Sequence, residues 1–143
     1  MADSGQIHAE VLTPEGKVFE GDLFQVSART VVGEVGVRAR HAPLLARLVP
    51  NVLRLYESAE DFNSSSGKRY VAAEGWLEVF ADRVVVLIEE AHDPDSLDPA
   101  ALKERIADAE QRMKEADEDS AAYEVAEADL RRNTAFLEVA EAS

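Results

Sequence analysis

The sequence holds three histidines, the residue type most often used as a general base or zinc ligand near neutral pH. They are His8, His41 and His92, and no two of them form an HExxH motif. The chain has no cysteine, which excludes disulfides, thiolate metal sites and a cysteine nucleophile. The spacing therefore predicts three unrelated histidines and no zinc site.

A second group of possible ligands is the acidic pattern Asp93, Asp95 and Asp98, whose carboxylates suit a hard cation. An EF-hand calcium loop also needs a glycine at its sharp turn, and the sequence lacks that glycine. Asp98 precedes Pro99, a pairing typical of a helix start. We therefore predict an exposed, helix-capping linker here and no metal site.

Motifs of enzymes and nucleotide-binding loops are missing from the sequence. Neither GxSxG nor GxxxxGK[ST] occurs, and GEVG at residues 33–36 is too short and too acidic for a dinucleotide fingerprint. No carboxylate lies in an apolar run that would raise its pKa for acid catalysis. We therefore predict no catalytic residue, no cofactor and no enzyme activity.

The most informative stretch is GEVGVRARHAPLLARL, residues 33–48. Its glycines allow tight turns or the close approach of another chain, and Pro43 cannot donate to a β-ladder. The pattern predicts a loop between strands, with the leucines at 44, 45 and 48 returning to the core. The polar side chains that this loop would offer as a partner-contact surface are Glu34, Arg38, Arg40 and His41.

Composition narrows the class of partner. The chain has 143 residues and a formal net charge of −14, which argues against binding to nucleic-acid phosphates. The first ten residues lack the basic and apolar regions of a secretory signal, and no apolar run approaches the roughly 20 residues of a membrane span. We expect a cytosolic protein, or one held at a membrane only through partners.

Residues 1–92 read as short strands separated by turns. Apolar and polar residues alternate over 7–12, and Pro14 and Gly16 then mark a turn. Residues 58–67 predict an exposed hairpin loop, and Trp76 is expected to be buried in its strand. The further predicted strands are 18–19, 23–29, 52–57, 68–73, 76–80 and 84–88. This spacing predicts an antiparallel all-β sandwich or flattened barrel.

Residues 93–143 predict a linker followed by an antiparallel helical hairpin. The first helix begins at Pro99, and DEDS at 117–120 separates it from a second helix that begins near Ala121. The predicted apolar stripes are Leu102, Ile106, Ala109, Met113 and Ala116, then Tyr123, Ala126, Leu130, Thr134 and Leu137. This segment holds 15 acids and 6 bases, a net charge of −9.

Four blocks carry a resemblance to a known family. They are VxTPEGxVFxG at 11–21, GExGVxxxHAPLLAxLxP at 33–50, GWLEVxxDRVxVL at 75–87, and the helical hairpin that opens with LD at 97–98 and ends near LRR at 130–132. Together these blocks resemble the epsilon subunit of the F-type ATP synthase over nearly the whole chain. The resemblance implies the same architecture, a β-sandwich over 1–92 and a regulatory hairpin over 93–143.

The resemblance also implies a role and partners. The protein would be a non-catalytic rotor subunit of the central stalk that couples c-ring rotation to ATP synthesis. Its sandwich would contact the gamma subunit and the c ring, with Glu34 and His41 carried over from the family's contact loop. It would be peripheral on the cytoplasmic side of the cell membrane.

In the family, the hairpin can reach the alpha/beta catalytic head and restrain hydrolysis, and some members bind ATP through an [IL]DxxRA motif and arginines of the last helix. Here Asp98 matches the motif, but Ala101 and Leu102 replace its Arg-Ala pair. Arg132 matches one helix arginine, whereas Phe136 replaces another. We therefore expect little or no ATP binding and only modest regulation of hydrolysis.

A free-standing β-sandwich binding module with a helical oligomerisation tail is the alternative. It predicts a ligand pocket lined by exposed aromatic side chains, and it predicts that the protein is purified without gamma.

Overall fold

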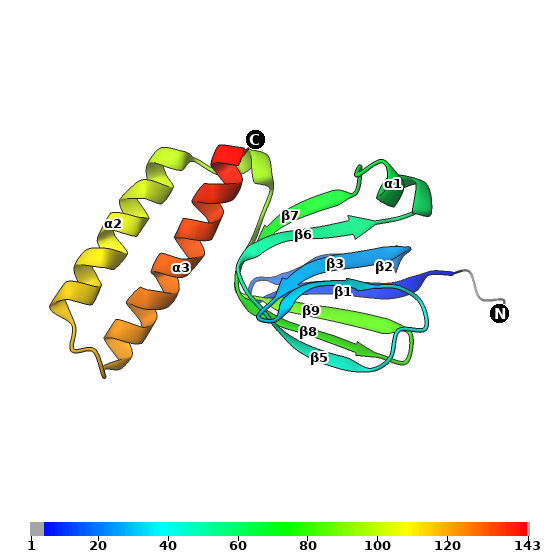
Figure 1. The fold of residues 1–143 in the computed structure, drawn as a ribbon, viewed down its shortest axis with the longest axis horizontal. Helices are drawn as coiled ribbons and strands as arrows, with labels where there is room; N and C mark the ends of the chain where they lie inside the picture. Colours follow the sequence, from blue (N-terminus) through cyan, green and yellow to red (C-terminus); the bar gives the residue numbers. More distant parts are fainter. Residues whose placement is uncertain (1–4, 143) are drawn as a thin grey trace. The chain divides into compact units, whose positions relative to one another are not determined.

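The chain divides into two compact units, Met1–His92 and Asp93–Ser143, of which the computed structural model describes residues 5–142 (Figure 1). The first unit is a β-structure with one short helix, and the second contains two long helices. The elements are β1 (Ile7–Thr13), β2 (Gly16–Leu23), β3 (Gln25–Thr30), β4 (Gly33–Val37), β5 (Leu44–Leu48), β6 (Asn51–Tyr56), α1 (Ala59–Asn63), β7 (Lys68–Ala72), β8 (Gly75–Phe80), β9 (Arg83–Ile88), β10 (Ala91–His92), the 3-10 turn η1 (Pro94–Ser96), α2 (Pro99–Glu115) and α3 (Ala121–Ala142).

The strands form one continuous sheet that folds over on itself as a sandwich. Its order is β10-β7-β6-β3-β5-β8-β9-β1-β2, and β4 pairs with β3 beside this path. The two halves of the sheet meet where β3 pairs with β5, at the residues Thr30 and Leu48. The predicted fold class is confirmed, although β1 pairs in parallel with β9, whereas the sequence predicted antiparallel strands throughout.

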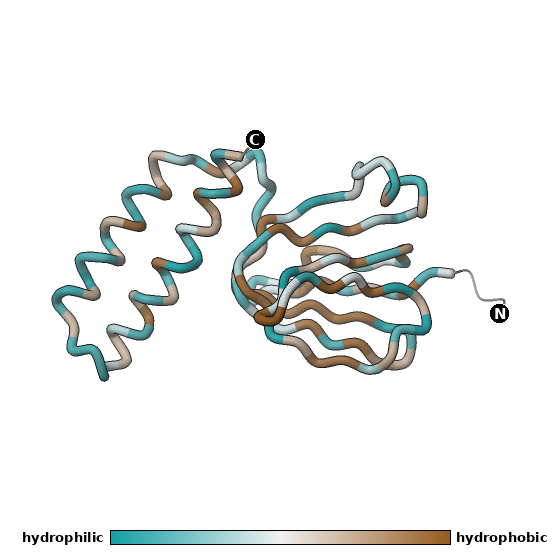
Figure 2. The backbone as a smooth tube through the Cα atoms, in the orientation of Figure 1, coloured by the Kyte–Doolittle hydropathy of each residue, from teal (hydrophilic) through white to brown (hydrophobic). Residues whose placement is uncertain are grey.

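Alternating side chains from both halves fill a common core. In β8, Leu77 and Val79 are buried whereas Trp76, Glu78 and Phe80 face outward, as the two-residue period of a strand requires. Figure 2 shows hydrophobic positions recurring along the strands of the sandwich. The largest fully buried side chains of this core are Ile7, Leu23, Leu53, Leu55 and Leu77.

The stretch predicted as a loop contains two strands. Residues 33–37 form β4, which pairs with β3 across a tight turn, and residues 44–48 form β5, which pairs with β8. Gly33 makes the turn possible with a φ of +127°, a conformation that side chains rarely adopt. The sequence interpretation was wrong here because cross-strand pairing outweighs the local turn signals of glycine and proline.

Three further expectations were wrong. Residues 59–63 form the short helix α1, capped by Ser58, within the segment predicted as a loop. Leu45 was placed in the core and Trp76 was expected to be buried, yet 65% of Leu45 and 46% of Trp76 are exposed. Strand register turns both side chains to the outer face, and a one-residue change of register would reverse them.

The two long helices begin at Pro99 and Ala121, as predicted, and the first ends before the predicted break at 117–120. The Asp98 carboxylate accepts a hydrogen bond from the Ala100 amide at 3.1 Å, with Pro99 at the first helical position. Ser120 caps α3 by accepting from the Tyr123 amide at 3.2 Å. No helix in the described part of the chain combines the length and the apolar content that are needed to cross a bilayer.

The apolar stripe of α3 differs from its prediction. Ala126, Asn133 and Phe136 are buried, whereas Thr134 is exposed. The Asn133 side-chain amide donates to the Asp129 carbonyl at 2.8 Å, so a polar residue occupies the helix interface without an unmet donor. The prediction was wrong here because it followed the spacing of apolar side chains, whereas the buried positions include the polar Asn133 and Phe136 in place of Thr134 and Leu137.

A charged network fastens β2 to β1. Asp22 and Glu20 contact the two ring nitrogens of His8, at 3.0 Å from Nδ1 and 2.9 Å from Nε2. Lys17 contacts Glu20 and lies 3.6 Å from Glu10, which also pairs with Arg83 at 3.1 Å. Hydrogen bonds that the His8 ring donates to Asp22 and, to a lesser extent, to Glu20 raise the pKa of His8 above its ordinary value of 6.5.

This network is also the one group in the described residues whose ligand atoms are close enough to hold a metal ion. Atoms of His8, Glu10 and Glu20 lie within 4.8 Å of one another. The ammonium of Lys17 and the guanidinium of Arg83 already neutralise these two carboxylates. The arrangement is complete as an ion-pair network, and we assign no metal to it.

The raised pKa of His8 predicts how the stability of the sandwich depends on pH. Protonated His8 stabilises the fold, and this contribution is full below pH 6.5 and lost as pH rises through the higher folded pKa. The free energy of unfolding, measured with urea at about pH 5.5 and about pH 8.5, should therefore fall with pH more in the wild type than in His8→Gln. A Glu20→Gln/Asp22→Asn variant should also show the weaker dependence, and identical profiles for all three proteins would contradict the assignment.

Candidate partner-contact surfaces

The turn between β3 and β4 presents two apolar side chains on a fixed backbone. The Thr30 hydroxyl donates to the Gly33 carbonyl at 2.7 Å and accepts from the Val32 amide at 3.1 Å. Val31 and Val32 at the tip are 58% and 93% exposed. An exposed apolar tip that is held by internal hydrogen bonds loses little freedom on binding a partner.

Glu34 lies just after this tip, at the start of β4. Its carboxylate pairs with Arg54 of β6 at 3.3 Å, and both side chains remain about 40% exposed (46% and 37%). Glu34 is therefore accessible, as predicted, but its charge is partly balanced from within the domain.

Arg38 lies at the other end of β4 and is engaged within the sandwich. Its guanidinium stacks 4.5 Å from the ring centroid of Phe24 and 5.1 Å from that of Phe62, and Nε donates to Gln25 at 2.6 Å. These cation–π contacts connect α1 to the end of the sandwich. The partner contact predicted for Arg38 stays a prediction, and its observed contacts are structural.

Arg40 and His41 follow in the connection to β5. Arg40 has a φ of +63°, and its amide donates to the Asp82 carboxylate in the β8–β9 turn at 2.7 Å. His41 is half-buried, and its Nδ1 lies 2.6 Å from the Ala42 carbonyl, to which it donates as the Nδ1–H form. These contacts hold the connection against the sandwich.

The four predicted contact residues do not form one cluster. Four residues of extended strand, at about 3.3 Å each, put roughly 13 Å between Glu34 and Arg38. Glu34 belongs to the tip end of β4, whereas Arg38, Arg40 and His41 belong to the end near Asp82. The structure therefore divides the predicted surface into two separate parts.

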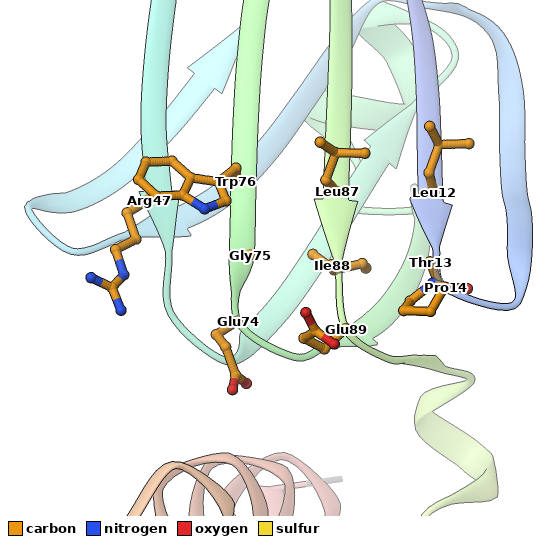
Figure 3. A pocket seen from close by; sticks show the side chains of 10 residues that line it. All are labelled: Leu12, Thr13, Pro14, Arg47, Glu74, Gly75, Trp76, Leu87, Ile88 and Glu89. Carbon is orange, nitrogen blue, oxygen red and sulfur yellow. The ribbon is translucent and has the colours of Figure 1, made fainter. Parts of the chain in front are cut away.

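A larger surface was missed from the sequence. One cross-strand row on the outer face joins Arg47 of β5, Trp76 of β8, Leu87 of β9 and Leu12 of β1 (Figure 3). Leu45, Trp76 and Leu87 are all exposed, and Phe80 extends the apolar area. The row borders an open pocket of about 520 Å³ that is lined by Leu12, Thr13, Pro14, Arg47, Glu74, Gly75, Trp76, Leu87, Ile88 and Glu89.

The signal for this surface was present in the strand alternation. In GWLEVF, Trp76 and Phe80 alternate with Leu77 and Val79, so both sides of β8 are largely apolar. An exposed apolar face of this kind marks a protein contact or a ligand groove.

The two residues carried over from the ATP-binding motif have structural contacts. Asp98 caps α2, and Arg132 lies 3.8 Å from Asp129 with 18% of its side chain exposed. Phe136 is buried in the helical hairpin. This arrangement leaves one partly shielded cation in place of the several that a triphosphate needs.

Comparison with known proteins identifies the family. The family model "ATP synthase, Delta/Epsilon chain, beta-sandwich domain" matches residues 6–94. The ATP synthase epsilon chain of Halalkalibacterium halodurans is 38% identical over 135 residues, which cover 94% of this chain and 96% of that protein. The epsilon chain of Persephonella marina is 35% identical over 74% of each chain.

The fold is also found in a solved assembly. A chain of the Euglena gracilis mitochondrial ATP synthase, from a structure of OSCP, F1 and c-ring, superposes with a TM-score of 0.75 over 99% of this chain and 84% of that chain, at 22% identity. From the family match and the identity to curated relatives, this chain belongs to the family of F-type ATP synthase epsilon chains, which are non-catalytic subunits of the complex.

Proposed function

We propose that this epsilon chain is a rotor component of the central stalk, which couples rotation of the c ring to ATP synthesis through separate contacts to gamma and to the ring. The observation that carries the proposal is the division of the exposed surface into an apolar sheet face and a rigid apolar turn. Structurally similar chains come from assemblies of F1 with the c-ring and of the central stalk with the c-ring, which supports this setting. The subunit would be peripheral on the cytoplasmic side of the membrane.

We assign gamma to the outer face of β5, β8, β9 and β1. Leu45, Trp76 and Leu87 provide an apolar centre, and Arg47 and Glu78 provide a charged rim. An aromatic and aliphatic centre within a polar rim is typical of protein interfaces. His41 and Arg40 lie in the connection that leads into β5, so we place their contacts on the same side.

We assign the c ring to the turn between β3 and β4. Val31 and Val32 supply apolar contact, and Glu34 supplies a carboxylate that would accept hydrogen bonds from donors in the ring's polar loops. The internal hydrogen bonds of Thr30 keep the turn rigid, as transmission of torque requires.

The helical hairpin is proposed to regulate hydrolysis only modestly. Its last helix carries Arg131 and Arg132, and both pair with acids of the same helix, at 3.6 Å to Glu127 and 3.8 Å to Asp129. Little positive charge is left for acidic parts of the alpha/beta head.

The alternative of a free-standing binding module has one observation in its favour. The open pocket beside Trp76 is the aromatic-lined hollow that such a module predicts. Residues that line this pocket also lie on the face assigned to gamma. The fluorescence emission of Trp76, the only tryptophan of the chain, therefore tests both functions.

Addition of gamma to the purified chain should shift the Trp76 emission to the blue and protect it from acrylamide, because the half-exposed ring becomes buried. Leu45→Asp should weaken gamma binding at least about tenfold, since burial of a leucine contributes about 1.5–3 kcal/mol. Val32→Asp is the control, because it introduces the same charge at the β3–β4 turn, where the valine is 93% exposed against 65% for Leu45, and it should bind gamma normally. Unchanged emission with gamma, together with a shift caused by a small ligand, would favour the binding module.

A cysteine at Glu34 should crosslink to the c ring in the assembled complex, because the turn is rigid and exposed. Val32→Asp should lower proton-driven ATP synthesis while leaving the subunit folded, since its side chain is 93% exposed. ATP synthesis by inverted membrane vesicles measures this effect. If the assembled complex synthesises ATP but gives no crosslink, the assignment of Glu34 to the c-ring contact is wrong.

Removal of residues 94–143 should raise ATP hydrolysis by less than about threefold, a barrier change below roughly 0.7 kcal/mol. The reason is the small amount of unpaired positive charge on α3. Hydrolysis by the reconstituted F1 complex is the measurement, and Asp98→Ala, which removes only the α2 cap, is the control for loss of helix stability. A tenfold rise on truncation would show that the hairpin is a strong inhibitor.

A further inference from the structure

Positive charge is concentrated on one half of the sandwich. The strands β3, β4, β6 and β7 together hold four bases and one acid, a net charge of +3 in a chain whose net charge is −14. The bases are Arg29, Arg54, Lys68 and Arg69, and the acid is Glu34.

Two of these bases are direct cross-strand neighbours. Arg54 of β6 lies opposite Arg69 of β7 in the antiparallel register. Like charges in this position destabilise a sheet. Glu34 pairs with Arg54 at 3.3 Å, but Arg69 makes no ion pair within the described part of the chain. The guanidinium groups of Arg54 and Arg69 therefore have one carboxylate, that of Glu34, to balance their two charges.

A hollow lies beside this pair. Its volume is about 320 Å³, and it is lined by Arg54, Tyr56, Ser65, Gly67 and Arg69. A Cβ atom at Gly67 would lie 2.6 Å from Tyr56 Cδ1 and 2.7 Å from the Leu55 carbonyl, so the fold admits only glycine there without a shift. Ser65, with a φ of +56° that a non-glycine residue adopts at some cost, adds a hydroxyl to the lining.

We propose that this hollow binds a phosphate group. Two guanidinium groups and a hydroxyl match the charge and the hydrogen-bonding capacity of a tetrahedral oxyanion, and arginine pairs with phosphate through two parallel hydrogen bonds. A bound dianion would also relieve the repulsion between Arg54 and Arg69. The site does not depend on the proposed rotor function, since none of the residues that line it is assigned to gamma or to the c ring, although Arg54 also pairs with Glu34 of the c-ring turn.

Free phosphate and a phosphate ester present the same group, and the hollow is open enough for either. Titration of the 15N-labelled full-length chain with inorganic phosphate and with phenyl phosphate distinguishes them. Both should give saturable shifts of the Arg54 and Arg69 Nε–H signals and of the amides of residues 65–69, with a Kd of about 1 mM. A tighter Kd for phenyl phosphate would assign the natural ligand to the esters, and a tighter Kd for phosphate would assign it to the free ion.

Arg69→Gln should weaken phosphate binding about tenfold, the loss expected for a charged hydrogen-bonding partner. Lys68→Gln is the matched control, because it removes the same charge from the neighbouring residue, whose side chain alternates to the other side of β7. Phosphate should also raise the Tm of the wild type and not that of Arg69→Gln. Equal weakening by both substitutions, or shifts that stay linear and spread over all arginines, would overturn the proposal.

Discussion

The structure depends on one constraint, the burial of one face of each half-sheet in a common core. Because side chains alternate along a strand, every strand of the sandwich has a single face left for contact with other molecules. In β8 the inward positions hold Leu77 and Val79, and the outward positions hold Trp76 and Phe80. The polarity and charge of the outward-facing side chains therefore decide what each half of the sandwich can bind.

Rigid turns hold the proposed contact surfaces apart. Thr30 fixes the turn that carries Val31 and Val32, and Asp82 fixes the connection that carries Arg40. Strand β4 lies between these two places, and its pairing with β3 fixes the distance between them. A stiff body with separate contacts would suit the torque transmission proposed for this subunit.

Charge is distributed as unevenly as apolar surface. The segment 93–143 has a net charge of −9, whereas the four strands β3, β4, β6 and β7 have a net charge of +3. At physiological salt, interactions between exposed charges are screened beyond about 8 Å. The electrostatics of this chain therefore depend on local pairs, and Arg54 and Arg69 have the single counter-charge of Glu34 between them.

The residue pattern alone was enough to predict the fold class, the start of both long helices, the helix cap at Asp98 and the family, because these features depend on local period, turn chemistry and motif order. Only the tertiary structure decided that Leu45 and Trp76 face outward, that Arg38 stacks between Phe24 and Phe62, and that Arg54 lies opposite Arg69. Each of these depends on strand register and on contacts between residues distant in sequence. Local sequence pattern leaves register open, since a shift of one residue exchanges the buried and exposed faces of a strand that is apolar on both sides.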